Sequence, residues 1–279
     1  MYIKCWGSRG SIPVSGREFQ KYGGDTTCIE IRTRSDDLII VDAGTGIRRL
    51  GNQLVHENRH VYNFIFTHSH WDHLLGFPFF KPLYYEESRI MMHRCPFPGK
   101  YVESIVTKMM RPPHFPVRYS DLTATVTYIE GCPQPFEIGS VSITPIPLSH
   151  PNGGCGYKFE EDGRSFVFLT DNELGFVHPG GCRYEDYERF CRGADLLLHD
   201  AEFLPEEYKS SIEWGHSSCM DTVRLAMDAL VDRLGLFHMN QDRTDDEVDL
   251  MLEGCLRYVS DKGSRLECLA VARDMEFEL

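Results

Sequence analysis

The sequence predicts an α+β fold, an αββα sandwich in which two mixed β-sheets face each other and helices cover their outer faces. Short apolar runs alternate with helix-like patterns along all 279 residues. The first half of the chain is rich in strand patterns and poor in helices, which fits hairpin sheets, whereas the second half mixes strand and helix. Two packed sheets with helices outside would bury both kinds of pattern.

Twelve strands are expected where runs rich in Ile, Val, Phe and Tyr are bounded by Gly, Asp, Asn or Ser. In chain order they are Tyr2–Trp6, Thr27–Arg32, Leu38–Asp42, Tyr62–Thr67, Ile90–His93, Ala124–Ile129, Val141–Pro147, Cys155–Phe159, Ser165–Thr170, Leu196–His199, Arg233–Phe237 and Glu267–Ala272. Five helices are expected at Ile47–Glu57, Tyr101–Met110, Tyr184–Cys191, Ser218–Leu230 and Asp245–Asp261. In the fourth helix, apolar residues recur at helical spacing, and Ser217 or Ser218 offers an N-cap.

A Pro-rich, irregular stretch at about 94–135 interrupts this alternation. Proline fixes φ and prevents a sheet from continuing, so we expect a lid-like insertion of loop and helix within one domain that spans 1–279. Phe79, Phe80, His114 and Phe115 would then cover the organic part of a substrate. The alternative is a surface excursion without a role.

Composition narrows the class of protein. The chain is 42% hydrophobic and 25% charged, as in ordinary globular proteins, and its net charge is −13. This acidic balance makes a large nucleic acid an improbable partner, but a small anionic substrate could bind at a local cationic site such as a metal. No apolar run approaches the ~18 residues of a membrane span, and the N-terminus has no apolar signal core.

The ten cysteines form no CxxC pair, so neither a zinc ribbon nor a thioredoxin-type redox pair is indicated. We expect them to be mostly buried and reduced, in a cytoplasmic protein. Whether the chain pairs as a homodimer is left open.

Three histidines and an aspartate follow one apolar strand in the segment Phe64-Ile-Phe-Thr-His68-Ser-His70-Trp-Asp72-His73. Side chains two apart on an extended end point the same way, so His68 and His70 can hold one metal ion. Asp72 and His73 begin the next turn and project to a neighbouring point, which suits a second ion. A purely structural role explains this density poorly, because unpaired buried polar groups are costly.

The spacing H-x-H-x-D-H after an apolar strand resembles the metallo-β-lactamase superfamily, and the resemblance extends over nearly the whole chain. It implies the fold of that family and three further ligands, each at the end of an expected strand: His150, Asp171 and His238. Asp171 would bridge two ions. The implied first site is His68, His70, His150 and Asp171, and the implied second site is Asp72, His73, Asp171 and His238.

All these ligands offer nitrogen or oxygen, which suits Zn²⁺ best and permits Mn²⁺ or Fe. Asp42, in the turn VDAGTG, resembles the aspartate with which this family orients a ligand histidine. The alternative for Asp42 is a turn or N-cap carboxylate.

Two further segments resemble one branch of the superfamily, the tRNA 3′-end ribonucleases and related phosphodiesterases. The segment Gly215-His216-Ser217-Ser218 is similar to their His-Ser-Thr motif, and His199-Asp200-Ala201-Glu202 is similar to their His-Glu-Ala-Thr motif. The resemblance implies that His216 stabilises or protonates phosphate oxygens and that Asp200 orients it, although Glu202 could serve instead. The alternative for His216 is a histidine in a polar turn before a helix.

The segments 6–13 and 22–29 resemble a bacterial phosphodiesterase-like subgroup loosely related to the cyclic-nucleotide phosphodiesterases. Within the first, Arg9 could face an anion or form a loop salt bridge. The long arm with which the tRNA ribonucleases hold tRNA is not evident, and with the charge of −13 this argues against a tRNA substrate.

The expected function is hydrolysis of a small phosphodiester, a cyclic nucleotide or similar, by hydroxide generated between two metal ions. The expected catalytic residues are His216, as proton donor to the leaving group, Asp200 and Asp72. Two alternatives remain: hydrolysis of a thioester, lactone or other acyl bond at the same metals, and a non-catalytic metal-dependent sensor.

Overall fold

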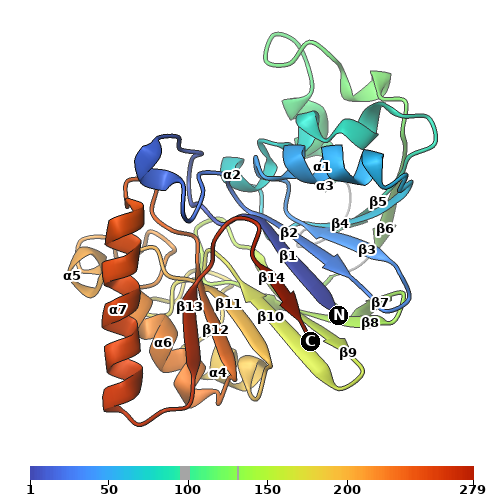
Figure 1. Ribbon diagram of the computed structural model, residues 1–279. Coiled ribbons are helices and arrows are strands. Elements are labelled where there is room, and N and C mark those ends of the chain that lie inside the picture. The colour runs from blue at the N-terminus through green and yellow to red at the C-terminus, as the bar shows by residue number, and fades with distance from the viewer. Residues whose placement is uncertain (95–100, 131) are drawn as a thin grey trace.

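Two seven-stranded sheets face each other in the computed structural model, which describes residues 1–94, 101–130 and 132–279 (Figure 1). The strand order is β14-β1-β2-β3-β4-β5-β6 in the first sheet and β13-β12-β11-β10-β9-β8-β7 in the second. Helices α1 and α3 lie against the outer face of the first sheet, and α4, α6 and α7 lie against that of the second. The predicted αββα sandwich is therefore confirmed.

The strands of the first sheet are β1 (Tyr2–Gly7), β2 (Cys28–Arg32), β3 (Leu38–Val41), β4 (Val61–Ile65), β5 (Arg89–Arg94), β6 (Thr125–Glu130) and β14 (Glu276–Glu278). Those of the second are β7 (Phe136–Ile138), β8 (Val141–Pro147), β9 (Cys155–Glu161), β10 (Arg164–Leu169), β11 (Leu196–Asp200), β12 (Arg233–Phe237) and β13 (Glu267–Ala270). The α-helices are α1 (Ile47–His56), α2 (Trp71–Leu74), α3 (Tyr101–Met109), α4 (Tyr184–Cys191), α5 (Pro205–Tyr208), α6 (Cys219–Asp228) and α7 (Asp245–Asp261).

All twelve predicted strands and all five predicted helices are present, with ends that shift by up to two residues. Ser218 is the N-cap of α6, and its side chain accepts a hydrogen bond from the Asp221 backbone N–H. Strands β7 and β14 and helices α2 and α5 were not predicted. Each has only three or four residues, too few for a recognisable periodicity.

The expectation of hairpin sheets in the first half is only partly met. Strands β1, β2 and β3 pair antiparallel, but β3, β4, β5 and β6 pair parallel. Parallel neighbours need a crossover, and α1 supplies it between β3 and β4 while α3 lies between β5 and β6. The second sheet is similar: its strands pair antiparallel from β7 to β10 and parallel from β10 to β13.

Alternating side chains of the central strands explain the layers. In β10, Phe166 and Phe168 belong to the core between the two sheets, whereas Val167 and Leu169 belong to the core under α4, α6 and α7. In the first sheet, Ile65 faces the second sheet and Phe64 faces α1. This period of two places one apolar face against each neighbouring layer.

The segment predicted as an insertion, 94–135, packs partly onto the first sheet. Its strand β6 pairs with β5, and Val106 and Met110 are fully buried in the outer core of that sheet. Residues 95–100 and 131 lie outside the described residues. Phe80 is fully buried in the same core and cannot cover a substrate, whereas Phe79 is exposed and makes an edge contact with Phe115. A lid over the site remains a prediction.

The structure describes nine cysteines. Eight of them are free thiols, of which seven are buried, and the ninth, Cys132, is disulfide-bonded. Among the described helices, none combines the length and apolar character that crossing a membrane requires.

Candidate metal centre

The residues predicted as ligands meet at one edge of the sandwich, where strands of both sheets end. His68 follows β4 and Asp42 follows β3 in the first sheet, while His150, Asp171 and His238 follow β8, β10 and β12 in the second. Asp42, Asp171 and His238 have φ values of 62°, 50° and 57°, in the left-handed region. Such backbone conformations are costly for residues other than glycine and gather at functional sites.

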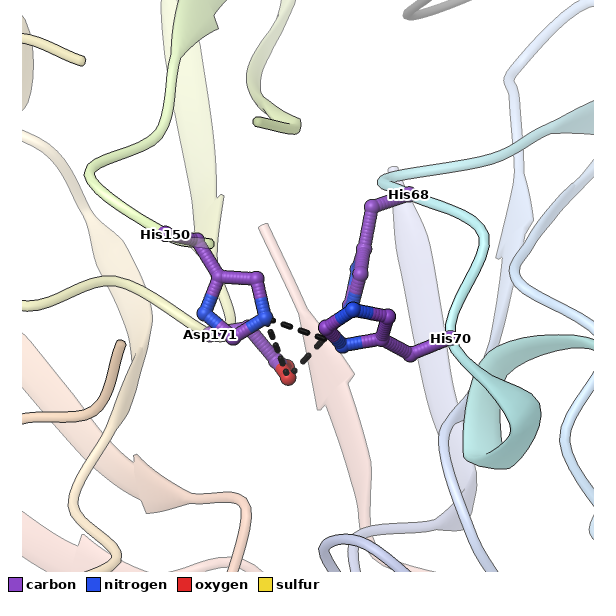
Figure 2. A group of neighbouring side chains, drawn as sticks. All are labelled: His68, His70, His150 and Asp171. Atoms are coloured by element: carbon purple, nitrogen blue, oxygen red, sulfur yellow. Dashed lines mark hydrogen bonds and ion pairs between the residues drawn. The ribbon is translucent and has the colours of Figure 1, made fainter. Parts of the chain in front are cut away.

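Four of the predicted ligands form a first group, with ligand atoms within 4.8 Å of one another: His68, His70, His150 and Asp171. Figure 2 shows the four side chains pointing toward a common centre. His150 Nε2 lies 3.0 Å from His70 Nδ1. Asp171 Oδ2 lies 3.5 Å from His68 Nε2 and 3.8 Å from His150 Nε2.

A second group consists of Asp72, His73, Asp171 and His238. Asp72 Oδ2 is 3.2 Å from His73 Nε2 and 3.1 Å from His238 Nε2. Asp171 contributes its other oxygen here, since Oδ1 lies 3.1 Å from His73 Nε2 and 3.3 Å from His238 Nε2. Asp171 therefore turns one oxygen to each group, as a bridging carboxylate would.

Three of these imidazoles are held in place by contacts to Nδ1, the ring nitrogen that points away from the centre. His73 Nδ1 lies 2.8 Å from Asp42 Oδ2, so Asp42 stands where the sequence predicted an orienting carboxylate. His150 Nδ1 contacts the Gly215 carbonyl at 2.9 Å, and His238 Nδ1 contacts Glu202 Oε2 at 3.0 Å. In each ring the outer nitrogen is engaged and Nε2 faces the centre, the arrangement typical of metal-ligating histidines. The contacts from Gly215 and Glu202 were not predicted.

Electrostatics and hydrogen bonding fit divalent cations. Burial lowers the pKa of His150 to about 3. Burial acts to raise the pKa of Asp171, but His238 and His73 offset this and hold that pKa well below its usual range. His68 Nε2 and His73 Nε2 are buried without a hydrogen-bond partner among the described residues. A buried nitrogen without a hydrogen bond is costly, and a divalent ion among these carboxylates would give both nitrogens a partner.

A third group lies beside the second and contains His216 and Asp200. Asp200 Oδ2 lies 2.6 Å from His216 Nδ1, and Glu202 Oε2 lies 3.4 Å away. Asp200 is thus the closer partner, while Glu202 makes its shorter contact with His238. Burial acts to lower the pKa of His216, but Asp200 and then Glu202 outweigh it and raise that pKa to about 9. The His216 ring stacks on His238 with centroids 4.8 Å apart.

The side chains of the three groups are almost completely buried. Only His70 and His216 are partly exposed, the side chain of His216 by 12%.

Arg9 takes neither of the roles considered for it. Its guanidinium is buried and donates to the backbone carbonyls of Gly23, Asn240 and Arg243. This fixes the segment that follows, whose Ser11 backbone N–H donates to Asp72 Oδ2 at 3.0 Å. Segment 6–13 thus packs beside the second group and contacts it through Ser11.

Comparison with known proteins adds family and fold. Residues 38–239 match the beta-lactamase superfamily domain. A ribonuclease Z of Sulfurisphaera tokodaii is 23% identical over 67% of this chain and 72% of its own length. The ribonuclease Z of Haloferax volcanii is 25% identical over 94% of this chain and 93% of its own length.

Solved structures share the fold. The metallo-β-lactamase fold protein YhfI from Bacillus subtilis superposes with a TM-score of 0.69 at 15% identity, covering 100% of this chain and 99% of that one. A diphosphatase from the PhnP family gives a TM-score of 0.68 at 17% identity, and the match covers 100% of this chain and 97% of the diphosphatase. At such identities the likeness shows the fold alone.

Proposed function

This chain belongs to the β-lactamase superfamily and is a metal-dependent hydrolase, and we propose that it cleaves small phosphodiesters, cyclic nucleotides or similar, with two divalent metal ions. The first group of ligands would hold one ion and the second group the other, with Asp171 shared. Zn²⁺ suits the nitrogen and oxygen donors best, and Mn²⁺ or Fe is compatible with them. Bound ions would supply Lewis acidity toward a phosphoryl oxygen and lower the pKa of a water molecule.

The contact between His216 and Asp200 is the observation that carries the choice of a phosphodiester. The alkoxide that leaves a phosphodiester is a poor leaving group unless it is protonated. His216 keeps a proton at neutral pH because Asp200 stabilises the imidazolium through Nδ1. When both ring nitrogens carry hydrogen, Nε2 can donate while Nδ1 stays bonded to Asp200.

Asp72 has a supporting part in this proposal. Its Oδ2 contacts two ligand histidines and accepts the backbone N–H of Ser11. Burial acts to raise the pKa of Asp72, but His73 and His238 outweigh it and hold that pKa well below its usual range. Asp72 therefore presents an ionised oxygen to the second group.

Charge supports a small substrate over a large nucleic acid. The relatives named ribonuclease Z act on RNA by their name, but this chain carries a net charge of −13. An acidic surface repels a polyanion over most of its length, whereas a small diester meets only the local field of the site. Eight of the nine described cysteines are free and Cys132 is disulfide-bonded. This excess of free thiols favours a reducing compartment, and we include the cytoplasm in the proposal.

Metal analysis with a parallel substrate panel tests the proposal. Cyclic nucleotides, bis-p-nitrophenyl phosphate, a precursor RNA, a lactone and a thioester are assayed on the metal-loaded protein. We expect turnover of the small diesters, with His70→Ala emptying the first group and Asp72→Ala weakening the second. Faster cleavage of the acyl substrates would refute the phosphodiesterase assignment, faster cleavage of RNA would refute the small substrate, and no turnover would favour the sensor.

A further inference from the structure

Glu173 lies two residues after Asp171, is 1% exposed, and is absent from the three groups of ligand residues. We propose that Glu173 is a positioning residue, which fixes the loop 213–216 and through it both His150 and His216. The part of this inference that concerns His216 rests on the proposed function. The part that concerns His150 does not, because it can be measured as metal affinity.

Both oxygens of Glu173 are fully used. Oε1 accepts hydrogen bonds from the Tyr208 hydroxyl at 2.7 Å and from the Glu213 backbone N–H at 2.9 Å. Oε2 accepts from the Gly215 backbone N–H at 2.8 Å and contacts His178 Nε2 at 2.8 Å. Three of these partners are donors, namely the Tyr208 hydroxyl and the two backbone N–H groups, so Gln at position 173 would turn its own N–H₂ group toward at least one of them.

Gly215 connects this carboxylate to the candidate metal centre. Its N–H donates to Glu173, its carbonyl contacts His150 Nδ1 at 2.9 Å, and the next residue is His216. Gly215 has a φ of +93°, and a Cβ there would lie 2.1 Å from His150 Nδ1. A residue without a side chain is therefore needed where the peptide passes His150, and the hydrogen bond from the Gly215 N–H to Glu173 holds that peptide there.

Ordinary structural stabilisation is the competing explanation, because a buried carboxylate with four polar contacts would stabilise any loop. The two oxygens allow a distinction. Tyr208→Phe removes a donor from Oε1 and leaves the contact of Oε2 with Gly215 intact, so it is the matched control. Glu173→Gln disturbs both oxygens.

The decisive measurement is Zn²⁺ affinity, by competition with a chromophoric chelator, on proteins whose folding is checked by circular dichroism. Substitutions behind a ligand histidine typically cost ~10–100-fold in metal affinity. We expect Glu173→Gln to weaken one of the two ions by that factor and Tyr208→Phe to leave both unchanged. In a His150→Ala background, Glu173→Gln should cause no further loss, because the contact through which it acts is already gone.

The proposal would be overturned if Glu173→Gln and the parent bound Zn²⁺ with equal affinity. It would also be overturned if Glu173→Gln lowered the Zn²⁺ affinity equally in the parent and in the His150→Ala background. If Glu173→Gln does not fold, Glu173→Asp tests the same link, because the shorter side chain withdraws the carboxylate from the Gly215 N–H, and unchanged Zn²⁺ affinity in that variant would also overturn it. For His216, Glu173→Gln should slow diesters with alkyl leaving groups more than those with p-nitrophenyl. An equal slowing would overturn that half alone. Failure of the proposed function would instead appear as a parent that cleaves no diester while the affinity results stand.

Discussion

Replacing His216 by Ala removes the proposed proton donor and the partner of Asp200. The lost hydrogen bond joins charged groups, and such bonds contribute ~1.5–3 kcal/mol. In the variant, Asp200 Oδ1 still accepts hydrogen bonds from the backbone N–H groups of Ser217 at 3.0 Å and Glu202 at 3.2 Å. The carboxylate is therefore not left without hydrogen-bond donors. Domains are stable by ~5–15 kcal/mol, so the variant should fold. No ligand of either group is removed, so both metal ions should remain.

The rate should respond far more than the fold. A proton donor to a poor leaving group contributes ~10²–10⁴-fold, and we expect His216→Ala to lose activity by that order on a diester with an alkyl leaving group. The loss should shrink on p-nitrophenyl esters, whose leaving group hardly needs a proton. Asp200→Asn should give a smaller defect of the same kind. The assay is kcat/KM on both substrates, alongside elemental analysis. Unchanged diester rates, or a missing metal ion, would refute the reasoning.

Four further outcomes are expected. Protein purified without chelator should contain about two transition-metal ions per chain. A content of at most one ion per chain, even after reconstitution with Zn²⁺ or Mn²⁺, would contradict the assignment of two metal sites. Asp171→Ala should lower occupancy of both ions, because its two oxygens face different groups; selective loss of one would argue against bridging. Asp42→Asn should weaken the ion held by His73 by ~10–100-fold in chelator competition, and equal affinity would deny Asp42 an orienting role. Phe168→Ala, in the core between the sheets, should cost ~3–5 kcal/mol in urea unfolding, and a change under 1 kcal/mol would show that this core is loosely packed.

His68, His70, Asp72 and His73 were predictable because their signal is local. They lie within six residues after one apolar run, and the carboxyl ends of strands meet at one edge of a packed sheet. His68 and His70 are close in sequence and in space. In the structure His150, Asp171 and His238 lie beside them, and before the structure only the resemblance to a family singled these three out.

The supporting contacts were not predictable, because their partners are remote in sequence. Glu173 lies two residues after Asp171, but three of the four groups that contact its carboxylate lie 35–42 positions further along, and only His178 is close in sequence. Arg9 looked able to face an anion, and only the structure reveals three backbone carbonyls gathered around it. In the fold, likewise, strands were visible as local runs, while the parallel pairing from β3 to β6 depends on where the crossovers return.

The division of the site between the two sheets has a consequence for biosynthesis. Asp72 and His238 are 166 positions apart in the sequence, but Asp72 Oδ2 lies 3.1 Å from His238 Nε2. A ribosome releases the N-terminal half first, so the H-x-H-x-D-H segment emerges long before its partners. The second group cannot close until the last quarter of the chain has been made and its sheet has packed. In the proposed two-metal centre, an ion at the second group would therefore bind late, after the two sheets have packed against each other.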